Sequence, residues 1–124
     1  MIDHVSVAVR DLQAATRFYE TTLGALGYAK LEVRAATVGF GKRYAEFWIN
    51  LRTAMDSPGD GAHVALRART SAEVDAFHAA AVTAGGKSDG APGLRPQHGE
   101  GYYAAFVRDL DDNRIEAVTF LNAR

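Results

Sequence analysis

The chain has 124 residues, of which 48% are hydrophobic, and this is enough for one compact domain with a buried core. It contains no cysteine, so disulfides, thiolate metal ligands and a cysteine nucleophile are excluded, and any metal must be held by nitrogen and oxygen. A formal net charge of −1, with acids and bases interspersed, argues against nucleic-acid binding. The sequence has no leader-like segment or long apolar span, so we expect a cytoplasmic protein without a membrane partner.

The first half of the chain is predicted to form one β-α-β-β-β unit. Residues 2–9 alternate as a half-buried strand does, with three valines on one face and His4, Ser6 and Ala8 on the other. Asp11 is a suitable N-cap for a helix of about fourteen residues, which Gly27 is expected to end. Three shorter strands are predicted over 28–33, 36–40 and 44–51.

The segment M-D-S-P-G-D-G over 55–61 predicts a linker between module one, residues 1–54, and module two, residues 62–124. After it the pattern begins again, because D-H-V-S-V-A-V-R aligns with A-H-V-A-L-R-A-R and sets His4 against His63. A further alignment, shifted by a longer loop, sets Asn50 against Glu116. The sequence therefore predicts an α+β domain of two tandem β-α-β-β-β modules.

In the second module, Thr70 and Glu73 have capping-box spacing and are expected to begin a helix that ends at Gly85-Gly86. The glycine- and proline-rich stretch 87–101 is interpreted as a loop that passes the cleft. An aromatic strand, an acidic turn and a final strand are predicted over 101–121. This order repeats that of the first module.

One carboxylate, Glu116, lies inside the apolar run of the final strand. Alternation places it with Val118 and Phe120 on one strand face, and an ionised carboxylate there must be solvated, paired or bound to a cation. His4 and His63 lie opposite the valine-rich strand faces, so two imidazoles and one carboxylate form a candidate three-point metal set. The alternative is that the three side chains simply hydrogen-bond across a polar groove.

Three motifs carry a resemblance to a known family. They are D-H-V-S-V-A-V-R-D-L followed by F-Y-E-x-x-L-G, H-V-A-L-R-A at the start of the second half, and F-V-R-D-L-D-D-N-R-I-E-A-V at its end. Over essentially its whole length the chain resembles the vicinal oxygen chelate superfamily of glyoxalases, extradiol dioxygenases, fosfomycin-resistance enzymes and bleomycin-resistance proteins. The last motif is similar to the family's D-P-D-G-N-x-I-E signature, with Leu110 in place of proline and Asp112 in place of glycine.

The resemblance implies a curved mixed sheet around a cleft that holds a divalent metal. It implies His4, His63 and Glu116 as the ligands here, with iron, manganese, nickel or zinc as the ion. The glyoxalase branch usually has a further glutamate on the last strand of the first module, and the alignment places Asn50 there. That departure argues against an unmodified glyoxalase I site. The resemblance also favours a homodimer, in which the partner chain sometimes completes the cleft.

Several other side chains are candidates for the cleft. Glu46 is a candidate base or displaced ligand and His98 a candidate general acid or base, although each is equally suited to a solvated surface position. Arg67 suits an anionic substrate. Aromatic side chains in strands are often plain packing, but Trp48, Tyr102 and Tyr103 are candidates for lining a pocket. The residues assigned to substrate binding are Trp48, Asn50, Arg67 and Tyr103.

Two functions follow from these residues and the resemblance. The first is a metal-dependent enzyme, a lyase, isomerase or dioxygenase, whose small oxygenated substrate chelates the metal. The second is a metal-free protein that binds a small molecule in an apolar groove, as in the bleomycin-resistance branch. An intact set of His4, His63 and Glu116 favours the enzyme, although one scaffold hosts several chemistries.

Overall fold

The computed structural model describes residues 1–54 and 63–121. The first module consists of β1 (Val5–Val9), α1 (Leu12–Gly24), β2 (Ala29–Val33), β3 (Thr37–Gly41) and β4 (Ala45–Leu51). The second consists of β5 (His63–Arg67), α2 (Ser71–Thr83), β6 (Lys87–Leu94), the 3-10 turn η1 (Pro96–His98), β7 (Tyr102–Arg108) and β8 (Arg114–Phe120). The predicted α+β fold of two β-α-β-β-β modules is confirmed. The predicted linker 55–61 lies outside the described residues.

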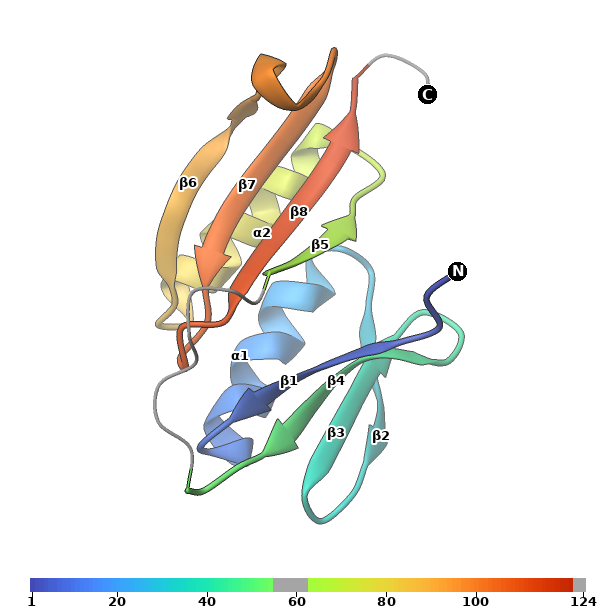
Figure 1. The fold of residues 1–124 in the computed structure, drawn as a ribbon, viewed down its shortest axis with the longest axis vertical. Coiled ribbons are helices and arrows are strands. Elements are labelled where there is room, and N and C mark those ends of the chain that lie inside the picture. Colours follow the sequence, from blue (N-terminus) through green and yellow to red (C-terminus); the bar gives the residue numbers. More distant parts are fainter. Residues whose placement is uncertain (55–62, 122–124) are drawn as a thin grey trace.

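Each module has a four-stranded mixed sheet. The strand orders are β1-β4-β3-β2 and β5-β8-β7-β6, so the first and last strands of each module are parallel neighbours. Figure 1 shows α2 behind β7 and β8, and α1 near the centre of the molecule. One hydrophobic core joins the helices to one face of both sheets, and it includes Phe18, Tyr19 and Phe77. The opposite sheet faces remain available for a site.

The helix starts follow from the predicted caps. Asp11 accepts a hydrogen bond from the Ala14 amide at 3.0 Å, and Thr70 Oγ1 accepts one from the Glu73 amide at 3.1 Å. These bonds satisfy amides that the first helical turn leaves without a partner. The end of α1 differs from the prediction, because the helix stops at Gly24 and Gly27 adopts a left-handed φ of 85° just beyond it.

Two strand predictions are wrong. The first strand begins at Val5, so His4 lies before it and not within it. The stretch 87–101 is not one loop, because residues 87–94 form β6 and pair with β7 through two register shifts. Glycine and proline are tolerated there because β6 is the edge strand of its sheet.

The turn between β7 and β8 connects the two modules. Asp109, 4% exposed, accepts a hydrogen bond from the Tyr19 hydroxyl of α1, and Asn113 donates its amide to the Ala8 carbonyl of β1 at 2.9 Å. Asp111 accepts from both the backbone amide and Nε of Arg10. These contacts tie the second module to the first at the ends of β1 and α1. No helix among the described residues is long and apolar enough to cross a membrane.

Candidate functional site

Glu116 is the centre of the candidate site. It is only 2% exposed, although its neighbours Ile115 and Ala117 on β8 belong to the core on the other sheet face. Its Oε1 lies 2.9 Å from His63 Nε2, and its Oε2 accepts a hydrogen bond from the Tyr102 hydroxyl. Both carboxylate oxygens therefore have a protein partner, and β5, β7 and β8 together build the site.

Aromatic rings surround this carboxylate. Phe106, the cross-strand neighbour of Glu116 on β7, has its ring centroid 6.2 Å from that of His63. Tyr102 contacts Phe120 edge-on at 5.4 Å between centroids, and the centroid of the His98 ring lies 5.2 Å from that of Tyr102. The predicted catalytic residue His98 is thus next to Tyr102, which in turn contacts Glu116. Aromatic neighbours limit the access of water and strengthen polar interactions.

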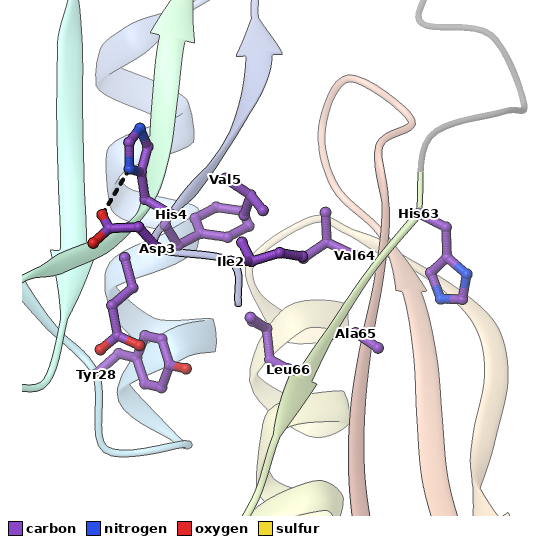
Figure 2. Close-up of a pocket in the computed structure, with 11 residues that line it drawn as sticks. Ile2, Asp3, His4, Val5, Tyr28, His63, Val64, Ala65 and Leu66 are labelled. Carbon is purple, nitrogen blue, oxygen red and sulfur yellow. Dashed lines mark hydrogen bonds and ion pairs between the residues drawn. The ribbon is translucent and has the colours of Figure 1, made fainter.

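His4 is separated from this pair. Its Nδ1 is 2.9 Å from Asp3 Oδ1, and its side chain is 57% exposed. His4 and His63 both line a crevice of about 320 Å³ between β1 and β5, but Figure 2 shows their rings pointing in opposite directions. Within residues 1–54 and 63–121, no three His, Asp or Glu side chains converge as a metal site would require. The structure brings together two of the three predicted ligands and leaves the third on the other module.

The strand register changes the equivalence between the modules. Two residues after His4, Ser6 pairs with Trp48, and two residues after His63, Ala65 pairs with Glu116. The residue equivalent to Glu116 is therefore Trp48, and the predicted match with Asn50 is wrong by two positions. Neither Trp48 nor Asn50 carries a carboxylate, so the first module has no acidic side chain at the position equivalent to Glu116.

Trp48 and Asn50 line a second hollow, on the open face of the first sheet. Its volume is about 390 Å³, and His4 and Ser6 lie at its side. Asn50 Oδ1 accepts a hydrogen bond from Thr37 at 2.6 Å, which leaves the Asn50 amide N–H groups for another partner. The Arg34 guanidinium lies over the Trp48 ring at 5.0 Å. This hollow combines an aromatic surface and neutral polar groups with two charged side chains, Arg34 and Asp3.

Glu46 does not share that hollow, because it is the extra residue at the register shift between β3 and β4, where alternation along β4 is interrupted. It lines the crevice between the modules instead, and the Lys42 amide approaches its Oε1 at 3.5 Å. The pKa of the nearby Tyr28 is raised by burial and, secondarily, by the charge of Glu46. Glu46 therefore lines the same crevice as His4 and His63, whereas Asn50 lines the other hollow.

The remaining predicted residues divide between the two faces of the second sheet. Arg67 lies on the open face, where its guanidinium is 4.6 Å from the Phe120 ring centre. Tyr103 faces α2, because its hydroxyl donates to Asp75 at 2.7 Å and its ring packs against the core. The choice of Tyr103 for the cleft is thus corrected to Tyr102. The alternation of strand faces would have placed Tyr102 on the same face as Glu116 only if the pairing of β7 with β8 had been known.

The chemistry of this donor set suits a divalent metal only in part. Imidazole nitrogen and carboxylate oxygen are ordinary ligands of zinc, iron, manganese and nickel, and His63 Nε2 and Glu116 Oε1 already face each other. Protein sites of this kind use at least three protein ligands, however. Among the described residues two such donors meet at this place, one fewer than a metal site of this kind needs.

Comparison with known proteins agrees with the fold. The model of the glyoxalase/bleomycin resistance protein/dioxygenase superfamily matches residues 1–117. A glyoxalase/bleomycin resistance protein from Albidiferax ferrireducens is 31% identical, with a TM-score of 0.84 over 94% of this chain and 96% of that one. No curated protein sequence matches this chain significantly.

More distant structures share the fold alone. A family enzyme from Burkholderia phytofirmans is 20% identical, with a TM-score of 0.76 over 97% of this chain and 98% of that one. The fosfomycin resistance protein FosX from Listeria monocytogenes is 16% identical, with a TM-score of 0.69 over 95% and 91% of the two chains. With the match to residues 1–117, this chain belongs to the glyoxalase/bleomycin resistance protein/dioxygenase superfamily.

Proposed function

We propose that the protein is a metal-dependent enzyme, a lyase, isomerase or dioxygenase, that acts on a small oxygenated substrate. The observation that carries this proposal is the buried carboxylate of Glu116, held on the open sheet face with His63 Nε2 at 2.9 Å. A buried carboxylate among aromatic rings costs free energy unless a charge or donors compensate it. His63 and Tyr102 supply this compensation for Glu116, and ionisable groups buried in this way are typical of functional sites.

The third ligand in this proposal is His4 of a second copy of the chain. His4 is largely exposed, and it lies on the other module, facing away from its own His63. In a two-fold symmetric dimer each contact occurs twice, so two identical sites form, each with His4 from one chain and His63 and Glu116 from the other. The homodimer and the metal site are then one proposal.

A divalent ion bound there would polarise a substrate oxygen or lower the pKa of bound water. The chain's own residues hold Glu116 in place through His63 and Tyr102, and they offer the Asn50 amide and the Arg67 guanidinium for substrate contacts. Trp48 and Asn50 cannot act as the carboxylate base of a glyoxalase I reaction. We therefore propose a reaction other than glutathione-dependent glyoxalase chemistry, in the cytoplasm.

Mixed chains test both parts of the proposal. We would measure the metal content of untagged protein after refolding an equal mixture of His4→Ala and Glu116→Ala chains. A site shared between chains predicts that each variant alone binds no metal and that the mixture recovers about a quarter of the wild-type content, since half the dimers carry one intact site. No recovery contradicts the shared site, and full metal content in Glu116→Ala alone contradicts the metal assignment. His78→Ala, which alters a histidine bonded to Ser88, is the control.

The metal-free binding protein remains a second candidate, and one observation favours it. Both oxygens of Glu116 already have protein partners, and the hollow beside Trp48 has a volume of about 390 Å³. An aromatic wall beside polar side chains suits a planar small molecule. Saturable quenching of Trp48 fluorescence by such a ligand in chelator-treated protein, with no metal bound at equilibrium, would favour this candidate over the enzyme.

A further inference from the structure

The open face of the second sheet carries a fixed guanidinium that sequence patterns do not reveal. Arg95 follows β6 directly, and its Nη2 donates a hydrogen bond to the Ala91 carbonyl at 2.5 Å, while Nη1 donates to the Leu94 carbonyl at 3.4 Å. The guanidinium carbon lies 5.3 Å from the centre of the Phe106 ring. Two backbone carbonyls and an aromatic face therefore hold the group in one place.

Two glycines make room for this arrangement. A Cβ atom at Gly90 would lie 3.2 Å from Arg95 Nη2 and 2.9 Å from Phe106 Cδ1, and a Cβ at Gly93 would lie 3.2 Å from Nη1. Both distances to the guanidinium are tighter than ordinary van der Waals contact. Side chains at these two positions of β6 would crowd the guanidinium, so the glycines leave room for it beside the strand.

Within the part of the chain that the structure describes, Arg95 has no carboxylate partner. Among the described ion pairs, Arg34 has Glu32 and Arg69 has Glu73, but no described carboxylate lies within ion-pair distance of Arg95. Its aromatic support, Phe106, is the cross-strand neighbour of Glu116. A positive group fixed beside the candidate site, with further N–H groups to donate, suits an anion.

We propose that Arg95 binds an anionic oxygen group of the substrate, namely a carboxylate, phosphate or phosphonate. This group would lie at one end of the substrate, and the reacting end would lie beside Glu116. This rests on the proposed function, because it assumes that the substrate lies on the open face of the second sheet. Since the guanidinium is already ordered, little side-chain entropy is lost when the anion binds. The planar fork of arginine also favours two parallel hydrogen bonds to such a group.

Inorganic phosphate and methylphosphonate are the probes for this site. We would titrate each into nitrogen-15-labelled protein at constant ionic strength and follow the backbone amide resonances of Ala91 and Phe106, which lie beside the guanidinium, by NMR. The expected result is a saturable shift in the wild type that is weakened about tenfold or more in Arg95→Gln. Arg43→Gln, which removes an exposed arginine of the first module, should bind the probes as the wild type does.

Gly93→Ala is a second variant, because it keeps the charge of Arg95 but crowds its Nη1. It should weaken probe binding without changing the net charge. Three outcomes overturn the proposal: non-saturable shifts in the wild type, unchanged binding in Arg95→Gln, or equal loss in Arg43→Gln. The proposed metal site is judged separately, because Glu116→Ala should lose metal yet keep the phosphate-dependent shift, and Arg95→Gln should keep metal.

Discussion

At the scale of single residues, the partners of Glu116 decide what the site can do. His63 contacts one oxygen and Tyr102 the other, so the carboxylate cannot rotate freely. His63 is half-exposed, whereas Tyr102 is braced by Phe120 and His98. A metal would replace the contact between His63 and Glu116 and leave that with Tyr102 intact. We therefore propose that Tyr102 is a positioning residue, because its hydrogen bond to Oε2 restricts the direction in which Oε1 points.

Tyr102→Phe should separate this positioning role from mere packing. The change removes the donor to Oε2 and leaves a buried carboxylate oxygen unpaired, which should lower the free energy of unfolding by about 1–3 kcal/mol. Loss of a group that orients a ligand should also weaken metal binding by about 10–100-fold. Chemical denaturation and metal competition measure the two effects. Tyr44→Phe, at an exposed position, is the control, and a Tyr102→Phe protein that matches it in both measurements contradicts the role.

The sequence predicts part of the site correctly and misses part of it for a physical reason. The contact between His63 and Glu116 agrees with the strand faces inferred from alternation, because both residues lie outside the apolar faces that form the core. The match of Asn50 with Glu116 fails because the pairing of the first and last strands of each module, which sets Trp48 against Glu116, is not visible in the sequence. The role of His4 as a ligand stays a prediction, since it depends on how two chains assemble.

At the scale of elements, composition misleads at β6 and succeeds at the acidic turn. The letters K-S-D-G-A-P-G-L suggest a loop, but neighbouring strand β7 supplies the hydrogen bonds that make an edge strand of them. In the turn, Asp112 stands where the resembling family has glycine and adopts a left-handed φ of 64°. Asn and Asp tolerate this conformation better than other side chains do. The substitution noted in the sequence therefore keeps the turn's geometry.

The buried carboxylate of Asp109 gives this turn a predictable pH dependence. It accepts hydrogen bonds from Tyr19, from the amides of Asp111 and Asn113, and from the Asn113 side chain. Burial nevertheless raises the pKa of Asp109 above its ordinary value, because desolvation outweighs these bonds. The folded state then holds this proton more tightly than the unfolded state does. The contribution of Asp109 to stability is therefore greatest at low pH and is lost as pH rises through its raised folded pKa.

Asp109→Asn should remove this titration. The difference in unfolding free energy between wild type and variant should shift in favour of the variant as pH rises above about 4, by no more than about 1.4 kcal/mol per pH unit. Urea denaturation between acid and neutral pH measures it. Tyr19→Phe keeps the carboxyl group but removes one of its donors, so its effect should grow as Asp109 ionises. A difference that is constant with pH, or that turns in favour of the wild type at high pH, contradicts the assignment.

At the scale of the whole molecule, the internal repeat predicts the two modules, but it does not predict how they meet. The modules meet through one shared core and the turn at 109–113, and in this arrangement His4, just before β1, does not meet Glu116 on β8. Repeat symmetry alone would place the two halves of a site together in one chain. The separation of its predicted ligands instead makes assembly of two chains the natural way to complete the site.

Assembly and metal binding should therefore be coupled. If each dimer holds two shared sites, free metal at about 100 times its dissociation constant adds about 2.7 kcal/mol per site to dimer stability. Two sites together should lower the dissociation constant of the dimer by about 10⁴-fold. Sedimentation velocity from nanomolar to micromolar protein, with and without chelator, measures this change.

The coupling should vanish in both His4→Ala and Glu116→Ala, because each removes a ligand from both shared sites, and it should persist in His78→Ala. A dimer whose dissociation constant is the same with metal bound as without it would place the whole site within one chain. A metal-loaded protein that stays monomeric at micromolar concentration would contradict the dimer as well. Linkage is reciprocal, so the same coupling predicts that metal affinity rises with protein concentration in the wild type. No such rise is expected in His4→Ala or Glu116→Ala.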